Sequence, residues 1–186
     1  MGSWSRIATR MRVPLGFVFA AAYFWFARPD WLSVGIGCAL VATGLVTRAV
    51  ASGHIQKNAE LATTGPYAYT RNPLYLGSVL MAIGFVIAAR NPWIAAAALA
   101  MFLAIYIPVI RAEEKYLGSA FPAYVEYASH VPRLLPRLTP YRPGDGEVSQ
   151  GGFSRELYLK HREYNAALGS ALMVAALILK ILLVHH

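Results

Sequence analysis

Residues 65–77 read Gly-Pro-Tyr-Ala-Tyr-Thr-Arg-Asn-Pro-Leu-Tyr-Leu-Gly, and the rest of the chain is organised around them. The pairs Gly65-Pro66 and Asn72-Pro73 are turn formers, and each proline biases the residue before it away from helix. Because proline suits the first helical position, we expect a helix to begin near Pro73. Its amino-terminal N–H groups could hold a carboxylate. The ordinary alternative is a loop that the three tyrosines of the stretch anchor at a membrane surface.

Composition places the chain in a bilayer. Its 186 residues are 57% hydrophobic and 14% charged, with a mean hydropathy of +0.45, and a soluble domain is less apolar. We therefore predict an all-α integral membrane protein with about five transmembrane helices, at residues 13–27, 31–50, 74–89, 92–110 and 166–184. The first and third segments are shorter than about 20 residues, so they need interfacial flanks or a locally thinner membrane.

The positions of the cations predict the orientation. If the amino terminus is cytoplasmic, only Arg28, Arg90 and Lys180 of the 17 Lys and Arg residues fall on the outer side. This is the positive-inside bias of a membrane protein, which we place in a bacterial inner membrane, and it argues against a nucleic-acid partner despite the net charge of +8. Cys38 is the single cysteine and His54 stands alone in a polar stretch, so we predict no metal site.

A second polar stretch, Arg-Ala-Glu-Glu-Lys-Tyr-Leu at 111–117, follows the fourth apolar segment. The third and fourth segments form a hairpin through residues 89–92, and two spans return the chain to the face it left. Asn72 and Arg111 should therefore share the cytoplasmic side. A solvated helix end is the ordinary interpretation of residues 111–117.

The remaining polar segments complete the predicted organisation. Residues 121–136 combine aromatics and prolines in a run that could fold back as a lid over a pocket at the membrane face. We predict a single membrane domain, 1–186, with a two-helix scaffold at 1–64, a core at 65–138, a Pro- and Gly-rich linker at 139–152, and an amphipathic stretch leading into the last span at 153–186. We assign no role to His185 and His186, which could be a tag remnant.

Four pieces in this order carry a family resemblance: Gly-Pro-Tyr…Arg-Asn-Pro-Leu-Tyr-Leu-Gly, an apolar hairpin, Glu-Glu-Lys-Tyr-Leu, and Phe-Pro-Ala-Tyr-Val-Glu-Tyr…Val-Pro-Arg. Together they span residues 65–136 and resemble the isoprenylcysteine carboxyl methyltransferase family and its phospholipid methyltransferase relatives. The family's usual Arg-His-Pro is Arg71-Asn72-Pro73 here. Asparagine forms hydrogen bonds but carries no proton at neutral pH, which leaves any acid–base role of that histidine in doubt.

The resemblance implies a S-adenosylmethionine site at the cytosolic interface, built without a Rossmann fold. One wall would consist of Gly65, Pro66, Tyr67, Arg71, Asn72, Pro73, Tyr75 and Leu76. Glu113 and Glu114 would lie opposite, and the adenosine would be covered by Phe121, Tyr124, Tyr127, Val131 and Pro132. The chemistry agrees, because a carboxylate suits an arginine, an ammonium suits a carboxylate, and a sulfonium is favoured by aromatic faces.

The methyl acceptor implied by the resemblance is a lipophilic molecule or a membrane lipid. A carboxylate acceptor is already a nucleophile and needs only a cation to align it, for which Arg111 and Arg133 are candidates. An amine of a phospholipid headgroup would need a base such as Glu114 to remove a proton. Two other functions stay open: a non-catalytic membrane protein and an NADPH-dependent relative of membrane sterol reductases.

Overall fold

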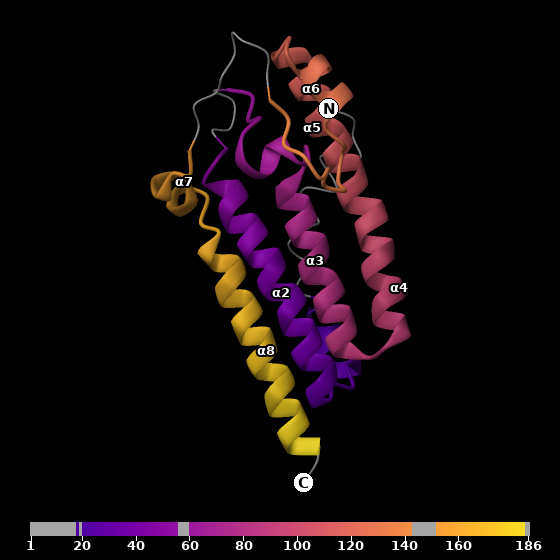
Figure 1. Ribbon diagram of the computed structural model, residues 1–186. Helices are drawn as coiled ribbons and strands as arrows, with labels where there is room; N and C mark the ends of the chain where they lie inside the picture. The colour runs from indigo at the N-terminus through magenta and orange to yellow at the C-terminus, as the bar shows by residue number, and fades with distance from the viewer. Residues whose placement is uncertain (1–17, 19, 56–59, 143–151, 185–186) are drawn as a thin grey trace. The chain divides into compact units, whose positions relative to one another are not determined.

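The computed structural model describes residues 18, 20–55, 60–142 and 152–184, and all regular secondary structure in these ranges is helical. This confirms the predicted all-α class. The elements are α2 (Trp31–Ser52), η1 (Gly65–Ala68), α3 (Pro73–Ala89), α4 (Pro92–Met101), η2 (Phe102–Tyr106), α5 (Ile107–Ala120), α6 (Tyr124–His130), α7 (Arg155–Lys160) and α8 (Tyr164–Val184) (Figure 1). Residues 20–26 are also helical. Most of the predicted linker, the start of the first span, His185 and His186 lie outside the described residues.

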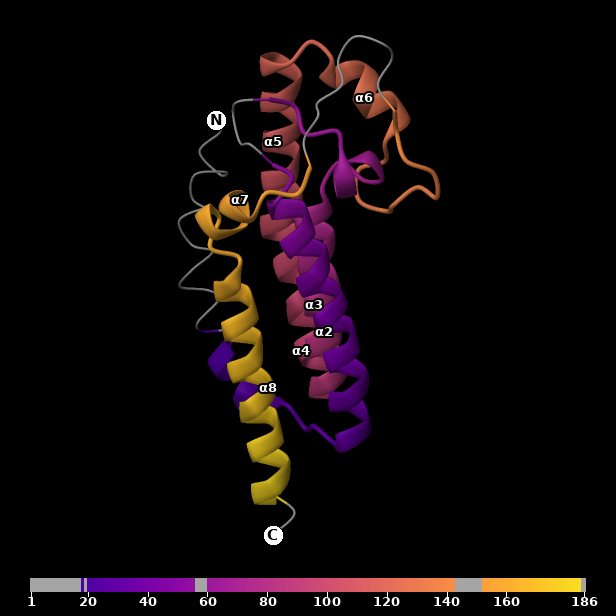
Figure 2. The same cartoon turned by 60° about the vertical axis from the view of Figure 1, so that its left-hand side comes forward.

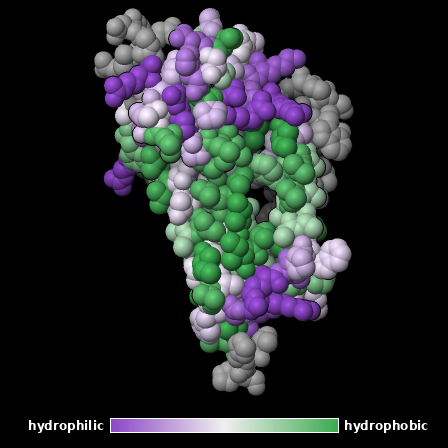
Figure 3. Space-filling model, turned by 45° about the vertical axis from the view of Figure 1, so that its right-hand side comes forward, coloured by the Kyte–Doolittle hydropathy of each residue, from purple (hydrophilic) through white to green (hydrophobic). Residues whose placement is uncertain are grey.

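Three helices in the described ranges are long and apolar enough to cross a membrane: Trp31–Ser52, Pro92–Ala120 and Tyr164–Leu183. They correspond to the second, fourth and fifth predicted spans. The third predicted span is α3, which is apolar but has 17 residues, and the first lies partly outside the described ranges, so the count of five stays a prediction. Hydrophobic side chains, green in Figure 3, are exposed along the helices, as contact with lipid requires.

Local side-chain caps explain where the helices begin. Ser33 N donates to Asp30 Oδ1 at 2.7 Å, and Asp30 N donates to Ser33 Oγ at 3.1 Å, which closes the first turn of α2. Helix α3 begins at Pro73, as predicted. Asn91 caps α4 by accepting from Trp93 N at 2.9 Å, and Pro92 follows it as the first helical residue. A short turn thus joins α3 to α4 in the predicted hairpin.

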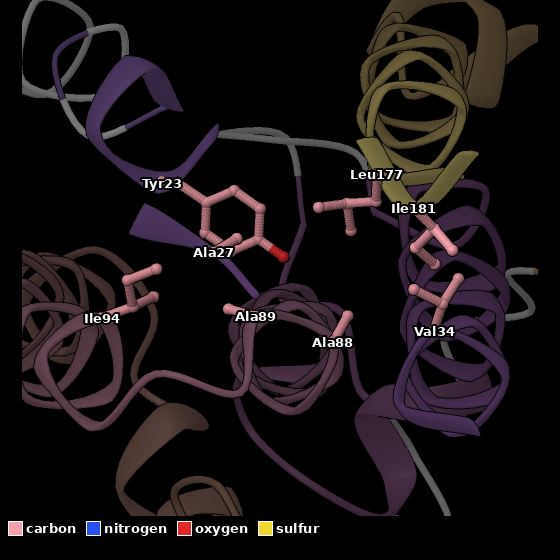
Figure 4. Close-up of a cluster of buried hydrophobic side chains, with 8 residues drawn as sticks. All are labelled: Tyr23, Ala27, Val34, Ala88, Ala89, Ile94, Leu177 and Ile181. Atoms are coloured by element: carbon pink, nitrogen blue, oxygen red, sulfur yellow. The ribbon is translucent and has the colours of Figure 1, made fainter. Parts of the chain in front are cut away.

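The chain folds as two compact units. Unit 1 comprises residues 1–42, 80–113 and 168–186, and unit 2 comprises residues 43–79 and 114–167. The core of unit 1 is a cluster of buried side chains, in which Ile181 of α8 lies against Val34 of α2 (Figure 4). Its members are Tyr23, Ala27, Val34, Ala88, Ala89, Ile94, Leu177 and Ile181. The hydroxyl of Tyr23 donates to the carbonyl oxygen of Phe85 at 2.8 Å, so this buried phenol is satisfied.

Two glycines allow α2 and α3 to approach closely within unit 1. A Cβ atom added to Gly37 would lie 2.5 Å from the carbonyl oxygen of Gly84, and one added to Gly84 would lie 2.6 Å from that of Gly37. Backbone atoms cannot move aside as a side chain can. Small residues at this position therefore set the distance between the two helices, as is common in membrane helix packing.

Unit 2 contains an ion pair between α2 and the turn that precedes α8. The Arg48 guanidinium donates to both carboxylate oxygens of Glu163 at 2.8–2.9 Å, and to the hydroxyl of Ser78 on α3 at 2.5 Å. In the same unit, α6 lies beside the carboxyl end of α5 in both ribbon views (Figure 2). Arg48 thus joins three separate segments of unit 2 through charge-assisted hydrogen bonds.

The close approach of α2 and α3 predicts a difference between two neighbouring glycines. We expect Gly37→Ala to lower the stability of the folded protein by about 1–3 kcal/mol, because the added methyl group meets the Gly84 carbonyl. Gly35→Ala is the matched control, since a Cβ there meets nothing within 4 Å. It should be neutral or stabilising by up to about 1 kcal/mol, because alanine is the better helix former. Thermal unfolding in detergent would compare the two, and equal effects would contradict the packing.

Candidate functional site

The carboxylate of Glu114, in the middle of α5, is the centre of a polar cluster in unit 2. Its side chain is only 10% exposed. Arg133 Nε lies 3.0 Å from Oε1 and 2.9 Å from Oε2, and Arg133 Nη2 lies 2.7 Å from Oε2. Asn72 Nδ2 donates to Oε1 at 3.3 Å, and Arg71 Nη1 lies 3.6 Å from the same oxygen. Two cations and an amide thus surround one nearly buried carboxylate.

Arg71 extends the cluster toward the aromatic residues of α6. Its Nη1 donates to the hydroxyl of Tyr124 at 3.3 Å. Burial raises the pKa of the Tyr124 phenol, and the charge of Glu114 raises it further. Arg71 Nε is buried and makes no hydrogen bond with the residues that the structure describes. The N–H of a buried guanidinium nitrogen of this kind can still donate a hydrogen bond to an anionic partner.

Asn72 connects two parts of the cluster through one nitrogen. Its Nδ2 donates to Glu114 Oε1 and also to the backbone carbonyl of Arg133, at 2.9 Å. The side chain is buried, and both of its N–H groups have an acceptor. Asn72 therefore fixes the Glu114 carboxylate relative to the backbone of the segment that supplies Arg133.

The segment after α6 lies along the stretch that precedes α3. Three backbone hydrogen bonds join them: Arg71 N to Pro132 O at 3.0 Å, Arg137 N to Tyr69 O at 2.9 Å, and Tyr141 N to Ala68 O at 2.8 Å. The buried Thr70 hydroxyl is within hydrogen-bond distance of two further carbonyls, those of Arg133 and Leu134, at 3.3 and 3.1 Å. The fold-back that we expected of residues 121–136 thus lies against residues 68–72.

An aromatic cluster next to the polar groups holds α6 in place. Tyr124, Tyr127 and Val131 are buried together, and Phe121 packs against them. The hydroxyl of Tyr127 donates to the carbonyl of Tyr67 at 2.7 Å. Burial raises the pKa of Tyr127, so the phenol stays protonated and keeps this hydrogen bond at neutral pH. These side chains hold α6 against the 65–72 stretch.

The structure brings most of the predicted site residues together in unit 2. Arg71, Asn72, Glu114, Tyr124 and Arg133 form the polar cluster. Phe121, Tyr127 and Val131 belong to the aromatic support, Tyr67 accepts a hydrogen bond from Tyr127, and Pro132 accepts one from Arg71 N. The other predicted residues lie in η1 and in the first turn of α3, and their contact with the cofactor stays a prediction: Gly65, Pro66, Pro73, Tyr75 and Leu76.

Two predicted residues are not part of this cluster. Arg111 and Glu113 are exposed on α5 and belong to unit 1. Sequence reasoning missed Thr70 and Tyr141, which join the two segments. Thr70 is a short polar residue within residues 65–77, and its place in that stretch was the only feature of the sequence that could have predicted its contact. Tyr141 lies in a proline-rich run without periodicity and gave none.

Comparison with known proteins relates the chain to membrane methyltransferases. The profile of a family described as phospholipid methyltransferase matches residues 18–123. A cobalt-zinc-cadmium resistance protein, CzcN of Cupriavidus metallidurans, is 36% identical over 138 residues, which are 70% of this chain and 64% of that protein. A nickel-cobalt-cadmium resistance protein, NccN of Alcaligenes xylosoxydans xylosoxydans, is 31% identical over 69% of this chain and 65% of its own length.

A third relative is named for its reaction. The protein-S-isoprenylcysteine O-methyltransferase of Saccharomyces cerevisiae is 35% identical over 58% of this chain and 51% of its own length. The chain thus spans less than two thirds of each of these three relatives. No solved structure matches it significantly. Among the described residues, no group of three or more His, Cys, Asp or Glu side chains could hold a metal ion.

The contact between the two segments predicts the effect of removing one hydroxyl. Thr70→Val keeps the side-chain shape but removes the hydroxyl that donates to the part-buried Leu134 carbonyl, so the 132–141 segment should detach more often. We expect the amides of Arg71, Arg137 and Tyr141 to exchange hydrogen about tenfold faster. Thr47→Val is the control, because the Thr47 hydroxyl bonds only within its own helix, to Thr43 O. Unchanged exchange in Thr70→Val would contradict the described contact.

Proposed function

The chain belongs to the phospholipid methyltransferase family, and we propose that it is an integral-membrane, S-adenosylmethionine-dependent methyltransferase that acts on a lipophilic carboxylate. One observation carries this proposal: Arg71 and Asn72 of the first family motif meet Glu114 of the second in one nearly buried cluster. Neither helix capping nor apolar packing requires residues of two distant motifs to contact the same carboxylate. A shared ligand gives a reason for it.

The residues of unit 2 fit the cofactor. The carboxylate of its methionine part suits Arg71, whose Nε has no hydrogen-bond partner among the described residues, and Arg133, whose side chain is 51% exposed. Its ammonium suits Glu114, and its adenosine suits the aromatic side chain of Phe121 and the exposed Pro132. When bound, S-adenosylmethionine supplies an electrophilic methyl group on a sulfonium. We place this site at the cytoplasmic face of a bacterial inner membrane.

The contacts of Glu114 favour a carboxylate acceptor over an amine. Arg133 and Asn72 donate to the two carboxylate oxygens of Glu114, and a bound cofactor ammonium would add a further donor, so Glu114 is not a free base in this arrangement. A carboxylate acceptor needs no base, because it attacks as the anion. We assign its alignment to the outer part of Arg133, whose side chain is 51% exposed. The name of the yeast relative supports this acceptor class.

A phospholipid amine is the second candidate acceptor, and the description of the matching family favours it. In that reaction Glu114 would have to leave Arg133 in order to take a proton from the headgroup ammonium. A reductase relative that binds NADPH and a non-catalytic membrane protein are the remaining alternatives. Binding of NADPH in place of the methyl donor would identify the first of these.

Cofactor binding should depend on the charge of Glu114. We expect Glu114→Gln to weaken S-adenosylmethionine binding at least about tenfold, because the variant loses the charge that pairs with an ammonium and that holds both arginines in place. Titration calorimetry of the purified protein in lipid nanodiscs would measure this. Glu126→Gln is the matched control, since Glu126 is exposed on α6, and it should bind like the wild type. Full affinity in Glu114→Gln, or no binding by the wild type, would refute the proposed site.

The product should identify the acceptor. With methyl-labelled cofactor and total membrane extract, we expect label that mild base releases as volatile methanol, because a carboxyl methyl ester hydrolyses and a methylamine does not. Label that lipid extraction recovers and that stays non-volatile after base treatment would instead assign the enzyme to phospholipid amines. Glu114→Gln should lose the label in either case.

A further inference from the structure

Residues 133–142, which we call the leucine loop, expose large aliphatic side chains beside the polar cluster. Leu135 is 77% exposed and Leu138 is 99% exposed. Both belong to a short stretch that also contains Pro136 and Pro140. Neither leucine contributes to the aromatic cluster that supports α6. Water is an unfavourable environment for two neighbouring exposed leucines, so their position calls for an apolar partner.

The shape of the leucine loop is fixed by hydrogen bonds on both sides. The backbone of Arg137 and Tyr141 donates to residues 68–69, and Thr70 lies within hydrogen-bond distance of the carbonyls of residues 133–134. Arg137 Nη1 donates to the carbonyl oxygen of His130, the last residue of α6, at 3.0 Å, and Nη2 donates to Thr139 Oγ1 within the loop at 3.4 Å. Leu135 and Leu138 are therefore presented outward from a backbone held at several points, and their exposure does not arise from a free tail.

The level of the leucine loop relative to a bilayer follows from its partner in unit 2. The loop pairs with residues 68–71, and the apolar helix α3 begins two residues later, at Pro73. We predict α3 to be the third membrane span. Its 17 residues cover about 26 Å, which is less than a hydrocarbon core of about 30 Å, so a membrane-crossing α3 would have its first residue at or inside the membrane surface. The loop beside it would lie at the same depth, in the headgroup zone.

The charges of the leucine loop suit that depth. Arg142 is exposed, and Arg137 is half-buried beside the two leucines. Apolar side chains next to arginines are typical of segments that lie in the interface of an anionic membrane, with the cations at the phosphates and the aliphatic groups below them. A soluble protein partner would explain why the two leucines are exposed. It would not explain why they lie at the level of the membrane surface, beside the start of α3.

We infer that the leucine loop is a membrane-inserting element, with Leu135 and Leu138 in the outer acyl region of an anionic leaflet and Arg142 at the headgroup phosphates. It rests on exposure, backbone contacts, charge and the predicted membrane crossing of α3. It holds whether or not the chain transfers a methyl group, and its test uses no cofactor.

Site-directed spin labelling measures the depth of each side chain directly. In a Cys38→Ser background, single cysteines replace Leu135, Leu138 and, as the aqueous control, Ser119. The helix Pro92–Ala120 has 29 residues and is about 43 Å long, longer than the hydrocarbon core, and Ser119 is exposed in its last turn. The labelled proteins are reconstituted in vesicles of phosphatidylethanolamine and phosphatidylglycerol, and collision rates with oxygen and with a water-soluble nickel chelate are compared by power saturation.

The ratio of the oxygen collision rate to the nickel-chelate collision rate should be several-fold higher for labels at positions 135 and 138 than for the label at position 119. The depth at 138 should also decrease when phosphatidylcholine replaces phosphatidylglycerol, because the attraction of Arg142 is lost. Nickel accessibility at 135 and 138 equal to that at Ser119 would overturn the inference and leave the leucines as a surface for a soluble partner. Equal depth in both lipid mixtures would overturn the role of Arg142.

Discussion

The carboxylate of Glu114 is the constraint on which the arrangement of unit 2 depends. An ionised group that is nine-tenths buried is costly unless donors surround it, and here the donors come from two other segments, 71–72 and 133. The middle of α5, the turn before α3 and the segment after α6 therefore have to meet at one place. The backbone hydrogen bonds between residues 68–71 and 132–141 and the aromatic packing beneath them follow from that meeting.

The contact between Asn72 and Glu114 depends on the tight hairpin between α3 and α4. Residues 72 and 114 are 42 positions apart. The chain between them runs along α3, turns at residues 90–91, and returns through α4 and η2 to α5. Asn91 and Pro92 make that turn short by capping and starting α4. Unit 1 supplies the apolar packing, with Gly37 and Gly84 in close contact, and the polar chemistry stays in unit 2.

The sequence predicted the features that local chemistry determines. Proline positions predicted the start of α3, and the two motifs predicted the polar residues that meet at Glu114. Hydropathy predicted five spans, of which three correspond to helices in the described residues that are long and apolar enough to cross a membrane. It did not predict the partners of Glu114 within the cluster. Arg133 could equally have faced solvent, and its pairing depends on the long-range docking of residues 132–141. The contributions of Thr70 and Tyr141 are likewise decided by tertiary contacts, which no periodic pattern records.

Asn72 gives this cluster a property that histidine at the same position would change. One amide nitrogen donates both to Glu114 and to the Arg133 carbonyl, and an amide has no protonation equilibrium in the physiological range. A neutral imidazole has a single N–H and could serve only one of these acceptors, so it would complete both bonds only as the cation. The donor that joins the two motifs in this chain is therefore the same at every physiological pH, whereas a histidine donor would be complete only after protonation.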